Sequence, residues 1–295
     1  MAEFDYIAPL SVEATLQLLN NTNRPAMLLA GGTRLLPDIR ANNIQPATLI
    51  DLRYLDILKH IRLENQLIDI GARTTFAEVE RNQLIQQSFP ILTEMSRSFA
   101  TPLVRSSATI GGNIASFAPV ADAIVPLLAL NATLALQASD GKTWNQPLAS
   151  FITTRTQYAL LTQISVPVLA KDAFWFYYKL GQRKDGAAAV ASVALIITTE
   201  EQHIKEARIA LGAITPVQLR ATRAETVLLN EPLPLSDQVI EHCLSTLATE
   251  LQEPRDDLWA SAAYRIMMSQ ALVKKALKQL NLYAQRNHKE KRGII

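Results

Sequence analysis

The stretch Thr109–Asp122 reads TIGGNIASFAPVAD, and a shorter counterpart, AGGTRLLP, occupies Ala30–Pro37. Each begins where an apolar run ends, and each combines a glycine pair with polar side chains and then an apolar, helix-like run. Glycine permits backbone conformations with φ > 0 and lacks the Cβ atom that would keep a ligand away from main-chain N–H groups. We therefore interpret the two stretches as glycine loops that together grip one pyrophosphate.

For either loop alone, the alternative is a plain turn, which is the commoner use of a glycine pair after a strand. Neither stretch is a Walker A sequence, and neither reads G-x-G-x-x-G, the usual dinucleotide fingerprint. The presence of two such loops in one chain favours the nucleotide interpretation. For Asp122 two roles stay open: it caps the helix expected at Ile124–Leu130, or it accepts hydrogen bonds from ligand hydroxyls.

The composition excludes several classes of protein. A chain of 295 residues with 48% hydrophobic residues can bury the cores of two domains. No apolar run approaches a membrane span and the N-terminus lacks a signal-peptide pattern, so we expect a soluble, cytoplasmic protein without a membrane partner. A net charge of +2 is too small to indicate a nucleic-acid partner. The single cysteine, Cys243, cannot hold an iron–sulfur cluster, so electrons that cross this chain need an organic cofactor.

The first part of the chain predicts two small units of helices and strands. Short buried strands are expected at Ala26–Leu29 and Thr48–Leu52, with the first glycine loop between them. A hairpin that turns at Glu64-Asn65 follows, and Thr75 with Glu78 has the spacing of a capping box at the start of a helix.

A change in composition near Leu169–Asp172 predicts the start of another domain. Its first strand is the aromatic stretch FWFYYKL, and the strands and helices after it describe a small sheet with helices on one face, ending in a long helix at Ala260–Leu282. We therefore expect a first domain over residues 1–170, with subdomains of about 1–55 and 56–170, a C-terminal α+β domain over 171–285, and a basic tail over 286–295.

Three motifs resemble those of a known family. AGGTRLLP, then LVRSSATIGGNIASFAPVAD, then SAAYR at Ser261–Arg265 look like motifs of the FAD-binding subunit of the molybdenum hydroxylases, which include xanthine dehydrogenase and carbon monoxide dehydrogenase. The resemblance runs from about Phe4 to Leu280. It implies an α+β protein with a two-subdomain FAD-binding fold of the vanillyl-alcohol-oxidase and p-cresol-methylhydroxylase type, followed by a smaller α+β C-terminal domain.

Carried over residue by residue, the resemblance implies a set of FAD ligands without catalytic residues or metal ligands. Leu161 is placed like an apolar contact to a cofactor ring. Lys179 matches a lysine near the flavin, where a cation could stabilise the anionic reduced ring, and its alternative is an exposed charge at a strand end. The implied FAD ligands are Leu29, Ala30, Gly31, Gly32, Thr33, Arg34, Leu35, Thr109, Ile110, Gly111, Gly112, Asn113, Ser116, Asp122, Leu161 and Lys179.

Two positions depart from the family pattern. Position 34 is arginine where the family commonly has a small polar residue, so the contact made by that side chain is not carried over. Gly186 stands where the family tends to have an aspartate, and Asp185 precedes it, so the role of that acid is left open.

The resemblance also implies partners. A large subunit with molybdopterin would oxidise the substrate, a small subunit with [2Fe-2S] clusters would carry the electrons, and FAD on this chain would pass them to NAD or another acceptor. Two alternatives stay open: a self-sufficient FAD-dependent oxidoreductase of the same fold, and a non-catalytic assembly protein that has kept the flavin fold.

Overall fold

The computed structural model describes residues 4–20, 26–154, 159–183 and 186–291, with side chains described as far as Arg286. The chain divides into two compact units. Unit 1 comprises Met1–Ala118 and Asn131–Val168, and unit 2 comprises Pro119–Leu130 and Leu169–Ile295. The short segment Pro119–Leu130 therefore interrupts unit 1 in sequence and belongs to unit 2.

The first part of unit 1 is a three-stranded parallel sheet in the order β1–β3–β2. Its strands are β1 (Asp5–Ile7), β3 (Thr48–Asp51) and β2 (Ala26–Leu29), and its helices are α1 (Val12–Leu19) and α2 (Leu35–Arg40). Leu29 pairs with Asp51 in the parallel register, so β2 and β3 end at the same edge of the sheet. The first glycine stretch begins at that edge.

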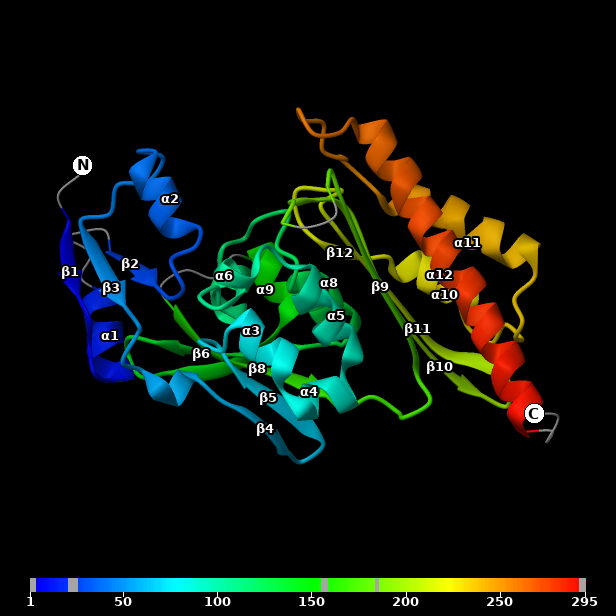
Figure 1. The fold of residues 1–295 in the computed structure, drawn as a ribbon, viewed down its shortest axis with the longest axis horizontal. Coiled ribbons are helices and arrows are strands. Elements are labelled where there is room, and N and C mark those ends of the chain that lie inside the picture. Colours follow the sequence, from blue (N-terminus) through cyan, green and yellow to red (C-terminus); the bar gives the residue numbers. More distant parts are fainter. Residues whose placement is uncertain (1–3, 21–25, 155–158, 184–185, 292–295) are drawn as a thin grey trace. The chain divides into compact units, whose positions relative to one another are not determined.

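The second part of unit 1 is a five-stranded antiparallel sheet (Figure 1). Asn65 and Gln66 both adopt left-handed conformations, so the hairpin turn lies one residue later than the expected Glu64-Asn65. The expected capping box of Thr75 and Glu78 is present at the start of α3. In sheet order the strands are β4 (Ile61–Glu64), β5 (Leu67–Gly71), β8 (Ala159–Pro167), β6 (Thr133–Ala138) and β7 (Thr143–Pro147). The helical segments are η1 (Asp56–Leu58), α3 (Phe76–Arg81), α4 (Gln83–Ser88), α5 (Pro90–Ser98), α6 (Pro102–Arg105), α7 (Ile110–Ala115) and α9 (Leu148–Thr154).

Unit 2 is built on a four-stranded antiparallel sheet in the order β12–β11–β10–β9. Figure 1 shows α10, α11 and α12 along one face of this sheet, and buried side chains from these helices and from the strands form one hydrophobic core. The strands are β9 (Phe174–Gly181), β10 (Ala189–Glu200), β11 (His203–Gly212) and β12 (Leu219–Arg220). The helices are α8 (Ile124–Ala129), α10 (Thr222–Leu228), α11 (Asp237–Glu250) and α12 (Ala262–Lys291).

The helix α8 also packs on β10 and β11, which adds a contact that the sequence analysis did not foresee. A Cβ atom on Gly212 of β11 would lie 2.4 Å from the side chain of Val125, so the helix and the strand approach closely at this glycine. The long apolar strand β10 is buried at every position from Ala189 to Ile197. Such continuous burial is expected of a central strand that is covered on both faces.

Across the described ranges, no helix is both long and apolar enough to cross a bilayer.

Candidate functional site

The first glycine stretch leaves the parallel sheet and turns at once into α2. The Leu29 carbonyl accepts the Leu52 N–H at 2.9 Å, which fixes the end of β2 beside the end of β3. Gly32 adopts φ of +67°, a left-handed conformation that favours glycine, as the sequence analysis expected. Thr33 after it is exposed, and Arg34 is a mostly exposed residue whose guanidinium lies 3.5 Å from Asp38. This loop is therefore a tight turn at a strand end, half-buried at its glycines and exposed from Thr33 onward.

The second glycine pair has a different local structure from the one expected. Gly111 and Gly112 lie in the first turn of α7, and neither has a positive φ. The Thr109 hydroxyl caps this helix by accepting the Gly112 N–H at 3.0 Å. Gly111 is required for another reason, because a Cβ atom there would lie 2.6 Å from the Ala72 carbonyl oxygen. The expectation of a turn with φ > 0 is wrong here: close packing of backbones, not chain reversal, demands glycine.

The two glycine stretches lie against each other within unit 1. A Cβ atom on Gly31 would lie 2.0 Å from the carbonyl oxygen of Ser107, two residues before the second stretch. A Cβ atom on Gly112 would lie 3.7 Å from the Ala30 side chain. Two segments that are about eighty residues apart in sequence thus meet, and at Gly31 the backbones approach so closely that only glycine fits.

Gly112 and Ser116 lie beside this contact in α7 and at its end. Gly112 is exposed, whereas Gly111 is buried beneath it. The Ser116 hydroxyl donates to the Asn113 carbonyl at 2.7 Å and accepts the Ala118 N–H at 3.3 Å, so it stabilises the end of α7. Short exposed turns of this kind can present main-chain N–H groups to an anionic ligand.

The proposed apolar ligands are mostly parts of the protein core. Leu29 is buried with Ile39 and Leu49 in a cluster of the small sheet, and Ile110 is buried at the start of α7. Leu161 is buried on β8, where it pairs with Leu136 of β6, and Leu35 is half-buried. Core packing therefore accounts for these positions whether or not a ligand also touches them.

Asp122 and Lys179 form a buried ion pair within unit 2. Lys179 Nζ lies 2.6 Å from Asp122 Oδ2, and the two side chains are only 6% and 4% exposed. Asp122 Oδ1 is buried as well and has no hydrogen-bond partner. Burial raises the pKa of the Asp122 carboxyl above its ordinary value, although the charge of Lys179 and the hydrogen bond from it act in the opposite direction.

This pair corrects two alternatives from the sequence. Asp122 does not cap α8, because the N-cap residue is Ala123, which makes no side-chain cap bond. Lys179 is not an exposed charge at a strand end, because its side chain is buried on β9. Burying a carboxylate oxygen without a hydrogen-bond partner is energetically costly. This oxygen is therefore suited to accept a hydrogen bond from a bound ligand.

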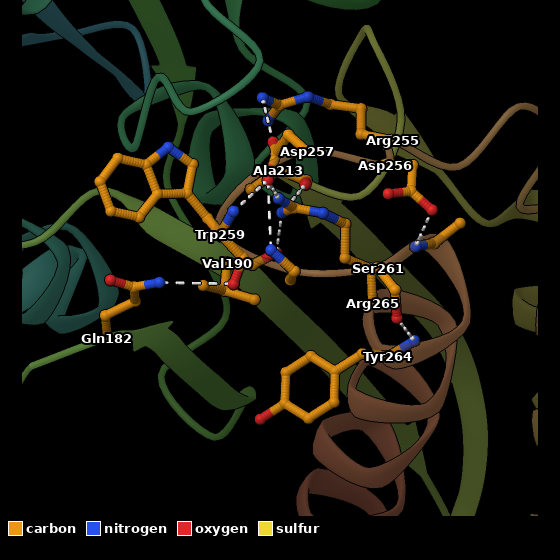
Figure 2. A network of polar contacts seen from close by, with 12 residues as sticks. Gln182, Val190, Ala213, Arg255, Asp256, Asp257, Trp259, Ser261, Tyr264 and Arg265 are labelled. Carbon is orange, nitrogen blue, oxygen red and sulfur yellow. Dashed lines mark hydrogen bonds and ion pairs between the residues drawn. The ribbon is translucent and has the colours of Figure 1, made fainter.

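Two arginines outside the expected set of FAD ligands fix the surroundings. Arg105 pairs with Glu80 at 3.1 Å and donates to the Phe99 carbonyl at 3.0 Å, so it anchors the segment before the second glycine stretch rather than pointing freely at a ligand. Arg265, from the SAAYR motif, is fully buried in unit 2 (Figure 2). The burial of Arg265 could have been predicted from its spacing, which places it on the same helical face as the buried Leu272 and Ala276.

Two predicted features lie outside what can be described. Asp185 falls outside the described residues, and so do the side chains of the basic tail beyond Arg286. In the rest of the chain that the structure describes, no group of three or more His, Cys, Asp or Glu side chains is arranged to hold a metal ion.

Comparisons with known proteins cover almost the whole chain. Residues 2–169 match the family described as the FAD binding domain in molybdopterin dehydrogenase, and residues 176–280 match the carbon monoxide dehydrogenase flavoprotein C-terminal domain. The glyceraldehyde dehydrogenase medium chain of Sulfolobus acidocaldarius is 30% identical over 284 residues, which is 94% of this chain and 98% of that one. The carbon monoxide dehydrogenase medium chain of Hydrogenophaga pseudoflava is 31% identical over 278 residues, 93% and 96% of the two chains.

A solved structure agrees with these sequence matches. A chain of carbon monoxide dehydrogenase from Hydrogenophaga pseudoflava, in a form that lacks the Mo-pyranopterin moiety, superposes with a TM-score of 0.89 at 32% identity, covering 94% of this chain and 96% of that one. These findings confirm the resemblance, the expected fold class and FAD as the cofactor of the family. The chain belongs to the FAD-binding medium subunits of the molybdenum hydroxylases, a family of oxidoreductase subunits.

Proposed function

We propose that this chain holds FAD for a multi-subunit molybdenum hydroxylase and connects the iron–sulfur clusters of a small partner subunit with an electron acceptor such as NAD. A large partner subunit with molybdopterin would oxidise the organic substrate. The relatives named above are medium chains of dehydrogenases, which supports the assignment of such partners. Bound flavin supplies the ability to accept electrons singly and release them in pairs, a chemistry that amino-acid side chains lack.

The observation that carries the proposal is the contact between the two glycine stretches. A Cβ atom on Gly31 would meet the Ser107 carbonyl oxygen at 2.0 Å, so the two loops cannot come together with any other residue at position 31. The first turn is half-buried at Ala30, Gly31 and Gly32 and exposed at Thr33 and Arg34, and Gly112 at the start of α7 is exposed beside it. We assign the diphosphate of FAD to the main-chain groups at these two places.

The remaining ligands follow from the family resemblance and from the chemistry of their surroundings. Asp122 Oδ1 lacks a donor, which suits an acceptor for a ligand hydroxyl, and the buried ammonium of Lys179 suits a place where negative charge develops. We extend the assignment to both residues. Asn113 and Ser116 are assigned as polar neighbours of the diphosphate, and Leu161 as an apolar neighbour of a ring.

The catalytic contribution of these residues would be binding and orientation. Within this proposal no side chain of the chain transfers a proton to or from the organic substrate, since that substrate reacts on another subunit. The loops would fix the cofactor in one position, and Lys179 would favour extra negative charge near it by an electrostatic interaction that burial strengthens.

The test is purification of the native complex that contains this chain. We expect stoichiometric FAD on this chain, together with a molybdopterin subunit and an iron–sulfur subunit, and reduction of NAD or a dye only by the assembled complex. Substrate turnover by the isolated chain would favour the self-sufficient oxidoreductase. A chain that never shows the visible absorption bands of flavin, even after incubation with FAD, would favour the assembly protein and would overturn the proposal.

A further inference from the structure

A rigid turn in unit 2 displays two large apolar side chains to solvent. Asp257 holds this turn: its Oδ1 accepts the N–H groups of Trp259 at 2.9 Å and of Ala260 at 3.2 Å. Within this turn, the Leu258 side chain is 100% exposed and the Trp259 side chain is 64% exposed. Gln182 donates to the Trp259 carbonyl at 3.4 Å from the end of β9, which adds a second attachment (Figure 2).

The buried Arg265 fixes the turn to the core of unit 2. Its Nη2 donates to Asp257 Oδ1 at 2.6 Å, while its Nη1 donates to the carbonyls of Val190 at 2.6 Å and Ala213 at 2.7 Å (Figure 2). Arg255 donates to the other carboxylate oxygen of Asp257 at 2.8 Å. The exposed Leu258 and Trp259 are therefore supported by a connected set of charge-assisted hydrogen bonds and do not belong to a loose loop.

Two further apolar side chains are exposed in the first turns of α12, which follows the turn. Tyr264 is 41% exposed and Met267 is 55% exposed, and their spacing of three residues places them on one helical face. The opposite face of α12 packs into the core through residues such as Leu272 and Leu277. Leu258, Trp259, Tyr264 and Met267 together are called the docking surface below.

The composition and rigidity of the docking surface suit a protein interface. Tryptophan, tyrosine and methionine are enriched at the centres of interfaces, whereas scattered exposed leucines need no explanation. A Trp side chain held in place before binding loses little conformational entropy when a partner covers it. The hydrogen-bond set around Asp257 fixes the backbone that carries the Trp259 side chain.

The charges beside the docking surface define the partner. Between Ala262 and Arg286, α12 contains five basic residues and no acidic residue. Ala271, Lys275 and Lys278 are exposed and follow Met267 at spacings of four, four and three residues, so the apolar surface runs into a positively charged one. A complementary partner combines an apolar groove with carboxylates at one end. A second copy of this chain would bring the same lysines to a symmetric contact and is disfavoured.

We propose that the docking surface inserts into an apolar groove, flanked by carboxylates, on a partner subunit of the same complex. The inference rests on the proposed function, because it takes the partner from the assembly proposed above. Trp259 is the central residue of the contact, and Lys275 and Lys278 steer the encounter.

The experiment measures binding of the full-length, FAD-loaded chain to the subcomplex of the molybdopterin and iron–sulfur subunits. We expect Trp259→Ser to raise Kd by at least about 30-fold, since a central tryptophan is a typical hot spot. Leu63→Ser on β4 of unit 1 removes another exposed leucine and is the matched control, expected to bind within about twofold of wild type. Equal flavin content and equal thermal unfolding in both variants show that the fold is retained.

A charge-reversed pair tests the second part of the inference. Lys275→Glu with Lys278→Glu is expected to lower the association rate by about 10-fold at low salt and by much less at high salt, while Lys142→Glu in the β6–β7 turn leaves the rate unchanged. A salt-independent association rate in all three proteins would overturn the assigned partner chemistry.

The outcomes separate this inference from the proposed function. If wild type binds the subcomplex and Trp259→Ser binds equally well, the docking surface is wrong and the proposed function stands. If wild type does not bind the subcomplex at all, both are overturned. If wild type sediments as a dimer that Trp259→Ser abolishes, the surface contacts a second copy and the assigned partner is wrong.

Discussion

Gly31→Ala is the sharpest perturbation of the candidate site, because it adds one methyl group at the contact between the two glycine stretches. The new Cβ would lie 2.0 Å from the Ser107 oxygen, 2.8 Å from the Ser107 carbonyl carbon and 2.9 Å from Ala108 Cα. All three atoms belong to the backbone, so no side chain can rotate away. The segments must separate by about 1 Å before the oxygen contact becomes tolerable.

The size of the effect follows from this overlap. Overpacking by one methyl group typically costs about 1–3 kcal/mol, and a backbone partner places the cost near the upper limit. In the free protein the loops can relieve part of the strain by moving apart. Bound FAD would then need to draw them together again, so a cost of about 1.4–2.8 kcal/mol would appear as a 10- to 100-fold higher Kd. Any remaining strain lowers the melting temperature by about 2–4 °C for each kcal/mol.

The assay pairs a FAD titration, followed by flavin fluorescence, with thermal unfolding of the free protein. Gly141→Ala is the control in the same unit: its φ of +81° makes alanine unfavourable by about 1–2 kcal/mol, but its Cβ would meet no atom within 4 Å. We expect Gly141→Ala to lower stability and to leave FAD affinity unchanged. A Gly31→Ala protein that keeps both wild-type stability and wild-type FAD affinity would refute the placement of the two loops.

Three further predictions concern unit 2. Asp122→Asn should destabilise the protein by about 3–5 kcal/mol, because it leaves the buried ammonium of Lys179 without its carboxylate. The double variant Asp122→Leu with Lys179→Met should recover much of that stability but not the FAD affinity, as measured by urea unfolding and FAD titration. Asp257→Asn should lower the free energy of unfolding at pH 7. Burial acts to raise the pKa of Asp257, but hydrogen bonds from Trp259 and Arg265 outweigh it and hold this pKa below its ordinary value of 3.8. In urea melts, the stability that the variant lacks relative to wild type should therefore shrink as the pH falls below that value. Burial raises the pKa of the Cys243 thiol to about 12, so a thiol reagent at pH 8 should modify it only after unfolding, and rapid labelling of the native protein would contradict its burial.

Elements with a local cause could be predicted from the sequence. The capping box of Thr75 and Glu78 is formed by two residues three positions apart, and both of its hydrogen bonds are present. The strands at Ala26–Leu29 and Thr48–Asp51 are short apolar runs between turn residues. In each case the determining interaction lies within a few residues, which is the range that periodicity and capping patterns describe.

The local conformation of the glycine pairs could be predicted only in part. Both pairs look alike in sequence, yet Gly32 turns the chain with a positive φ and Gly111 lies in a helix against the Ala72 backbone. The sequence around Gly111 contains nothing that identifies Ala72 as its neighbour. Glycine marks a place where a Cβ is not tolerated, and tertiary contacts decide whether the reason is torsional or steric.

The same limit explains why the role of Asp122 was not resolved. An aspartate two residues before a helix has the position of a cap, but its partner Lys179 is 57 residues away in sequence. The segment that contains Asp122 is held in unit 2 by equally distant contacts: the Pro119 carbonyl accepts the Ala213 N–H and the Gln218 amide, each at 3.0 Å. At the other end of α8, Arg220 and Arg208 donate to the carbonyls of Leu128 and Ala129, each at 3.3 Å.

These contacts hold α8 in place, and α8 follows the second glycine stretch directly in sequence. The carbonyls at the end of a short helix have no partner within it, and here two arginines of the unit 2 sheet supply the donors. Because α8 is apolar on every side, it cannot be stable without such packing. The second glycine stretch runs directly into this segment, because α7 ends at Ala115 and the segment begins at Pro119. A substitution such as Arg220→Met removes one of these donors and loosens α8. Because α8 is joined to the second glycine stretch by only a few residues, this substitution should also change the conformation of that stretch, although Arg220 is more than a hundred residues away in sequence.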